Sequence, residues 1–114
     1  MTIVDFLNAR LDEDQAAARA AAPGPWKGEN TKVFDNAGDP VADTGSPTTA
    51  EHITRHDPAR VLREVALRRR IVREVDEYTR FSRDRLAGEM SRQVLGALAG
   101  TYADHPDFNP DWAV

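Results

Sequence analysis

A continuous helical pattern over residues 58–99 restricts the fold of this chain more than any other feature of its sequence. Apolar residues recur there at α-helical spacing, and no proline follows Pro58 until Pro106. These apolar residues are Leu62, Val65, Val72, Val75, Tyr78, Leu86, Met90, Val94 and Leu98. A single helix over this range would be roughly 63 Å long at 1.5 Å per residue, about twice the diameter of a domain of this size. The helix must therefore break or pair with another chain.

We expect the break near Gly88. The polar stretch at 79–84 has Phe81 as its one sizeable apolar side chain, which favours a weak point there or at Gly88. With a break, a second, antiparallel helix would run to Gly100. The alternative is a continuous helix that projects from the domain and pairs with a second copy of the chain.

The first twenty or so residues also predict a helix. Thr2 followed three residues later by Asp5 resembles a capping box, and apolar residues at helical spacing lead into an alanine-rich run ending at Ala22. Pro23 and Pro25 end this helix because proline lacks the backbone amide and disfavours helix in the residue before it.

Residues 26–45 fit a short β-hairpin, with strands at 32–35 and 40–43 and turn residues at 36–39. An isolated two-stranded hairpin is only marginally stable in water, so one face of this hairpin should pack against a helix. The side chains expected to contact that helix are Val33 or Phe34, and Val41.

Two helix starts follow the hairpin. The Ser-Pro-Thr run at 46–48, with Glu51 three residues after its threonine, predicts a short helix over 49–56. Asp57 and Pro58 then form an N-cap and a first-turn proline for the long helix, because Asp accepts hydrogen bonds from free amides and Pro has no amide to leave unpaired.

The tail at 101–114 has two prolines and two aromatic anchors, Phe108 and Trp112, and is expected to pack in an extended form. The fold class is therefore mainly α with a small β-hairpin, an α+β arrangement. Its 114 residues suit one domain over 1–114, since a chain of this length can bury one core.

Composition restricts the function and the compartment. The absence of cysteine excludes disulfides, thiolate metal sites and thiol nucleophiles, and it suits a reducing compartment. The front of the chain has early acidic residues and no long apolar run, so neither a signal peptide nor a transmembrane span is predicted. We therefore expect a cytoplasmic protein, in a bacterial host cell by the resemblance described below, without membrane association.

The net charge of −4 is unevenly distributed. Residues 59–100 hold ten basic and six acidic residues, whereas residues 1–58 hold five and ten, and residues 101–114 hold none and three. The long helix is thus the basic element, and the acidic flanks are expected to lie near it in the fold or in a dimer.

The three histidines give one candidate site. His52 and His56 are four residues apart and share a helical face, so they can bind one metal ion together. His105, with Asp104, would complete a tetrahedral zinc site if the fold brought them there. The alternative is that these are polar residues at a helix end, where His56 is favourably placed at a helix C-terminus.

A cluster of arginines gives a second candidate site, made of Arg68, Arg69, Arg70 and Arg73. Such a helical face can follow a phosphate backbone or bind a protein partner. Acidic residues four positions away favour instead a solvated or partner-facing helix with internal ion pairs. The pairs expected from this spacing are Glu64 with Arg68, Arg70 with Glu74, Arg73 with Glu77 and Asp76 with Arg80.

No motif indicates an enzyme. No serine has the sequence context of a nucleophile elbow, and the seven glycines are too scattered for a phosphate-binding loop. The sequence therefore favours a function other than catalysis.

Three segments carry a resemblance to a known family: AEHITRHDPARVL at 50–62, YADHPDF at 102–108 with Trp112 after it, and the front at 6–14. Together they resemble an uncharacterised family of small proteins of actinobacteria and their phages, a domain of unknown function. The resemblance implies no chemistry. Many relatives have cysteines between the long helix and the C-terminal motif, and this chain has none.

The sequence thus predicts a small intracellular accessory protein that binds a protein partner or forms a homodimer through its long arginine-rich helix. Two alternatives stay open. One is a metal-binding or hydrolytic protein that uses His52, His56 and His105, with zinc as the ion. The other is a nucleic-acid-binding regulator that uses the arginine face.

Overall fold

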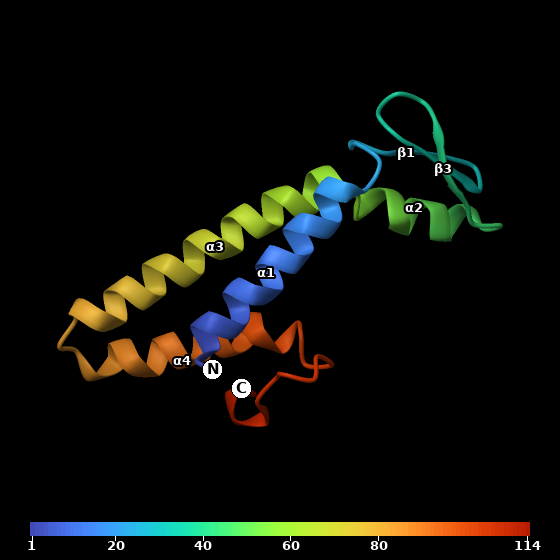
Figure 1. Cartoon of the computed structure of the whole chain (residues 1–114). Coiled ribbons are helices and arrows are strands. Elements are labelled where there is room, and N and C mark those ends of the chain that lie inside the picture. Colours follow the sequence, from blue (N-terminus) through green and yellow to red (C-terminus); the bar gives the residue numbers. More distant parts are fainter. The chain divides into compact units, whose positions relative to one another are not determined.

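The computed structural model describes residues 1–114 and contains four α-helices, a three-stranded antiparallel sheet and one 3-10 turn (Figure 1). The predicted class, mainly α with a small β element, is confirmed. The elements in chain order are α1 (Ile3–Ala20), β1 (Lys27–Glu29), β2 (Lys32–Phe34), β3 (Pro40–Asp43), α2 (Pro47–Arg55), α3 (Pro58–Phe81), α4 (Arg85–Gly100) and η1 (Pro110–Trp112).

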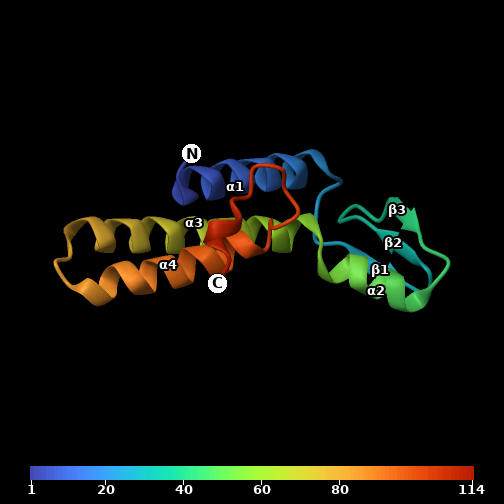
Figure 2. The same cartoon turned by 90° about the horizontal axis from the view of Figure 1, so that it is seen from below.

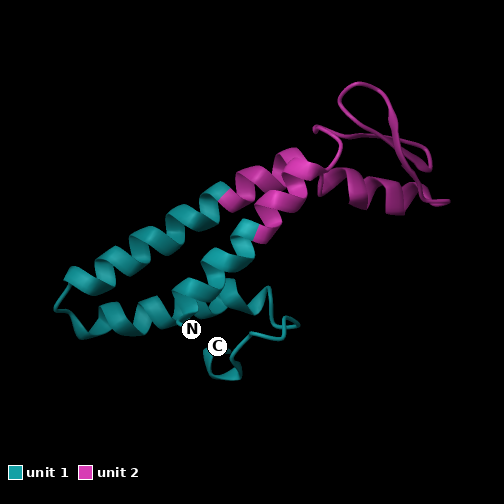
Figure 3. Cartoon of the chain, viewed as in Figure 1, with its two compact units in different colours: residues 1–12, 66–114 teal, residues 13–65 magenta.

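The chain divides into two compact units (Figure 3). Unit 1 consists of Met1–Asp12 and Ala66–Val114, and unit 2 of Glu13–Val65. Helices α1 and α3 each contribute residues to both units. None of the helices is both long enough and apolar enough to span a membrane.

The predicted capping box at the start of α1 is present. The amide of Asp5 donates to Thr2 Oγ1 at 3.1 Å, and the amide of Thr2 donates to Asp5 Oδ2 at 3.2 Å. The two residues thus satisfy each other's backbone donors at a helix end that has no preceding turn. This backbone hydrogen bond, followed by the Thr2 hydroxyl, lowers the pKa of Asp5.

The sheet of unit 2 confirms the predicted hairpin and adds a strand to it. β2 pairs with β3, as predicted, and β1 pairs with the other edge of β2. Val33 on β2 is fully buried and Val41 on β3 partly buried, and both β1 and β2 contact α2. A Cβ on Gly28 would lie 2.9 Å from Thr54 Oγ1, so β1 needs glycine to approach α2 this closely.

Polar side chains cap both helices at the 46–58 junction. α2 begins two residues earlier than predicted: Ser46 is its N-cap, with Ser46 Oγ accepting from the amide of Thr49 at 3.4 Å. Asp57 caps α3 as predicted, since its Oδ1 accepts from the amide of Arg60 at 2.8 Å. Its Oδ2 accepts from the amide of Trp26 at 2.8 Å, so this buried carboxylate also holds the segment that leads into the sheet.

The long helical stretch breaks, as expected, at residues 82–84. This position lies in the polar stretch 79–84, which the sequence indicated as one of two weak points, and not at Gly88, the other. α3 ends at Phe81, and Asp84 caps α4 by accepting from the amide of Leu86 at 2.9 Å. Gly88 lies inside α4, and a Cβ there would meet nothing within 4 Å. The break follows the polar residues that can cap a new helix, whereas an isolated glycine is tolerated inside a helix.

Unit 1 is built on the hairpin of α3 and α4, which lie side by side in both views (Figures 1 and 2). The start of α1 packs against it, and the buried core consists of Phe6, Leu7, Val72, Leu95 and Ala99.

The tail after α4 is folded back in turns and is not extended as predicted. Amides of Tyr102, His105 and Phe108 each donate to a carbonyl three residues earlier, at 2.9, 2.9 and 3.0 Å. The two predicted anchors are confirmed, because Phe108 and Trp112 both pack on the ring of Phe6. The turns have a local cause. Phe108 and Trp112 pack on the core and keep the segment close to the end of α4, where its backbone N–H groups form hydrogen bonds with nearby carbonyl groups.

Candidate functional site

Large apolar side chains are exposed on one part of the molecule, the α3–α4 hairpin. They are Leu67, Tyr78, Phe81, Leu86 and Met90, with exposed fractions between 58% and 84%. The other exposed large hydrophobic residues are the two chain ends, Met1 and Val114. We call these five side chains the apolar hairpin face.

Helical geometry places most members of this face together. Phe81 follows Tyr78 by three residues on α3, and Leu86 and Met90 are four residues apart on α4, so each pair consists of surface neighbours. Leu67 shares the side of α3 with Tyr78 but precedes it by 11 residues, about 16 Å along the helix. Four of the five side chains therefore gather at the turn end of the hairpin.

A groove of about 330 Å³ runs between the two helices at this face. Tyr78 and Met90 line it from opposite helices, with the buried Ala87 and the half-buried Val75 and Val94 between them. The remaining lining residues are Glu74, Thr79 and Ser91. The Thr79 hydroxyl donates to the carbonyl of Val75 at 2.8 Å, so that polar group is already paired. The groove is therefore mainly apolar.

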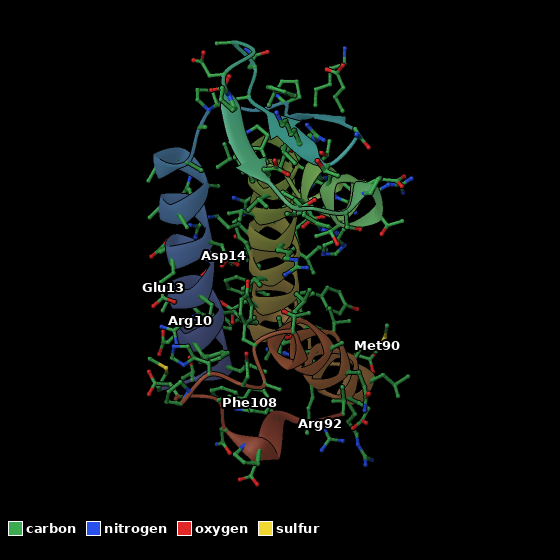
Figure 4. All side chains as sticks on the ribbon, turned by 90° about the vertical axis from the view of Figure 1, so that its right-hand side faces the viewer. Arg10, Glu13, Asp14, Met90, Arg92 and Phe108 are labelled. Carbon is green, nitrogen blue, oxygen red and sulfur yellow. The ribbon has the colours of Figure 1, made fainter.

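The groove lies toward the end of the hairpin that α1 does not reach. Phe6 and Leu7 of α1 pack in the core with Val72 of α3 and Leu95 of α4. In both views α1 begins well short of the turn between α3 and α4 (Figures 1 and 2), and Figure 4 shows Met90 projecting from α4 away from α1. The end of α3 and the start of α4 therefore extend beyond α1 and carry exposed apolar side chains.

Charged residues of both helices lie near the groove, and six of them form ion pairs. Three ion pairs lie within the hairpin: Arg70 with Glu74 at 3.0 Å, Arg80 with Asp76 at 3.3 Å and Arg92 with Glu89 at 2.9 Å. The hydrogen bonds from Arg92, with a further one from Gln93, lower the pKa of Glu89. In contrast, Glu77, Arg83 and Arg85 form no ion pair within the chain.

The arginine cluster predicted to bind a partner is partly engaged inside the chain. Arg69 pairs with Asp12 at 2.6 Å and Arg70 pairs with Glu74, while Arg68 and Arg69 are only half exposed. The contact with Asp12 confirms that an acidic flank lies near the helix. Glu64 pairs with Arg60 at 2.8 Å, and not with Arg68 as the spacing suggested, because Arg60 is also four residues away on the other side. Partner binding by these arginines stays a prediction.

The predicted zinc ligands fall in different units. His52 and His56 lie on α2 in unit 2, with ring centroids 4.6 Å apart, whereas Asp104 and His105 belong to unit 1. The structure contains no group of three or more His, Cys, Asp or Glu side chains arranged to hold a metal ion. Zinc binding stays a prediction.

His105 has a structural environment that the sequence did not reveal. Arg10, a buried residue of α1, points its Nη1 at the His105 ring, 2.7 Å from Nδ1 and also close to Nε2. The Arg10 guanidinium lies over the Phe6 ring, 5.2 Å from its centroid, and 3.8 Å from the Asp107 carboxylate. The one sequence signal was the i, i+4 spacing of Phe6 and Arg10. This cluster holds the tail on α1.

The fold and these sites define a small helical protein whose α3–α4 hairpin packs against α1 and carries exposed apolar side chains toward its turn. The chain belongs to a family of unknown function (DUF6221), whose model matches residues 1–114. The predicted resemblance to such a family is thereby confirmed. Searches of curated proteins and of solved structures found no match to the chain.

Proposed function

We propose that this protein is an interaction protein that binds a protein partner through the apolar hairpin face. The observation that supports this most is the concentration of exposed apolar side chains at the turn end of one hairpin, namely Tyr78, Phe81, Leu86 and Met90. Scattered exposed hydrophobic residues are ordinary, but a contiguous group indicates a binding surface. Here every such residue apart from the chain ends lies on α3 or α4.

The residue types and the shape support the same function. Aromatic residues and methionine are enriched at protein interfaces, and Tyr78 and Met90 stand at the two walls of the groove. Methionine also adapts its flexible side chain to differently shaped partners. An apolar groove between two helices suits the apolar side of a third helix, which would pack beside the hairpin turn as α1 packs on the rest of the hairpin.

Ion pairs reduce the positive charge that the α3–α4 hairpin offers to phosphates. Five of its ten arginines have an acidic neighbour within 4 Å, namely Arg60, Arg69, Arg70, Arg80 and Arg92. Nucleic-acid affinity rests on cations that are available to phosphates.

Site-specific photo-crosslinking tests the proposal. We would place p-benzoylphenylalanine at position 90, in the groove, and at position 92 as the control, since Arg92 is exposed on the same helix outside the groove lining. In cells that express the full chain, position 90 should give a discrete crosslinked species, either with a second copy or with another protein. Position 92 should give much less. Equal yields at both positions, or no product at position 90, would contradict the proposal.

A further inference from the structure

We propose that His52 and His56 alone form a binding site on α2 for one divalent transition-metal ion of the kind that imidazole binds, such as Zn²⁺. The two rings would be the ion's protein ligands, and water would fill its other coordination positions. Both histidines belong to unit 2 and the apolar hairpin face belongs to unit 1, so metal binding would be a property beyond the proposed function.

The two imidazoles lie at a separation that suits one shared ion. Their ring centroids are 4.6 Å apart and their planes are inclined at 49°. A tetrahedral zinc ion about 2.1 Å from one nitrogen of each ring would place the centroids roughly 5 Å apart. Small rotations of the two side chains would therefore be enough for both to bind the ion.

Both rings are also available to a ligand. His52 and His56 are exposed, and neither imidazole forms a hydrogen bond or an ion pair within the chain. The third histidine, His105, differs in this respect, because its Nδ1 lies 2.7 Å from Arg10 Nη1 and accepts from the amide of Asp107 at 3.0 Å. An ion at the first two rings would break no internal hydrogen bond.

The position of the pair at a helix end favours a cation. His56 is the C-cap of α2, and His52 lies in the last turn of that helix. The C-terminal end of a helix carries a partial negative charge that attracts cations within the last turn. The Arg60 side chain already donates to the carbonyl of Arg55 at this end, at 3.2 Å.

The acidic side chains near the pair in the sequence already have partners. Glu51 pairs with Arg55 at 3.0 Å and Glu64 with Arg60 at 2.8 Å, which offsets the charge of both arginines. Asp57 is buried and accepts hydrogen bonds from two backbone amides. The imidazoles are therefore the ligands that remain, and Mg²⁺, which prefers oxygen ligands, should not bind here.

Isothermal titration calorimetry of the purified full chain without an affinity tag tests the site. Zinc chloride should bind at one site per chain, and magnesium chloride should give no binding. His52→Gln and His56→Gln should each weaken zinc binding at least about tenfold, because a single imidazole lacks the second, tethered ligand. Both positions are exposed, so circular dichroism should show an unchanged fold.

Asp104→Asn is the matched control, because it removes an exposed candidate ligand of unit 1 and should leave zinc binding unchanged. An unmodified chain that binds no zinc would overturn the proposal. Zinc binding that survives both histidine substitutions would show an adventitious ion only. A loss with Asp104→Asn as large as with His52→Gln would show that the ion needs ligands from unit 1, which would also overturn the two-histidine site.

Discussion

Arg10 shows how much of unit 1 depends on a single side chain. Its guanidinium contacts His105, the Phe6 ring and the Asp107 carboxylate from a position that is 7% exposed. A buried charge is retained only where such partners compensate its desolvation. Because these partners come from the first and last parts of the chain, no local sequence pattern could predict the cluster.

Replacing Arg10 should therefore loosen the tail. Arg10→Met keeps the aliphatic bulk and removes the hydrogen bonds and the cation–π contact, so we expect a loss of about 2 kcal/mol in the free energy of unfolding. The fluorescence of Trp112 should also change in the folded state. Urea unfolding followed by fluorescence measures both. Arg19→Met, at an exposed position of α1, is the control and should have little effect. Equal effects of the two substitutions would contradict the assigned role.

Asp5 gives a pH-dependent prediction at the same scale. Its pKa lies below the ordinary 3.8, because the Thr2 amide and then the Thr2 hydroxyl donate to its carboxylate. A carboxyl with a lowered folded-state pKa stabilises the fold above its unfolded pKa, and this contribution is lost as the pH falls through the folded value. Asp5→Asn should thus lower the Tm at neutral pH. The difference from the unmodified chain should begin to shrink as the pH falls toward 3.8 and should vanish only below the lowered folded-state pKa. A Tm difference independent of pH would contradict this account.

At the scale of elements, the sequence predicted the features that depend on neighbouring residues. The capping box at Thr2 and the N-cap at Asp57 were predicted correctly because each forms a hydrogen bond between residues three positions apart. Strand β1 was missed because its three residues are all exposed and show no alternation, so only pairing with β2 makes it a strand. The break after α3 was expected, but glycine was given too much weight against the capping residue Asp84.

The corrected position of the break predicts opposite effects at two neighbouring sites. Asp84→Ala removes the N-cap of α4 and should cost about 1 kcal/mol of stability. Gly88→Ala should instead stabilise by up to about 1 kcal/mol, since the site is helical and a Cβ meets nothing within 4 Å. Thermal unfolding of both variants checks this. A destabilising Gly88→Ala would show that the helix breaks at the glycine after all.

At the scale of the whole molecule, the candidate site was present in the sequence but not recognisable as a surface. Tyr78, Leu86 and Met90 belong to the helical apolar stripe that predicted the long helix, and such a stripe is ordinarily core. Periodicity shows that a helix has an apolar side, but only the position of α1, which begins short of the hairpin turn, shows that this part of the stripe is left uncovered. The arginine cluster is more visible in the sequence, and local spacing predicted two of its neighbouring ion pairs correctly, Arg70 with Glu74 and Asp76 with Arg80.

The oxidation of the two methionines tests the central claim most directly. Met1 and Met90 are the chain's only methionines and are similarly exposed, at 73% and 65%, so Met1 serves as an internal reference. With dilute peroxide and mass spectrometry, Met90 should be oxidised more slowly than Met1 in a concentrated lysate of the cells that express the chain, where the partner is present, and at a similar rate in the dilute purified chain. If Met90 were oxidised as fast as Met1 in the lysate, no partner would cover the apolar hairpin face.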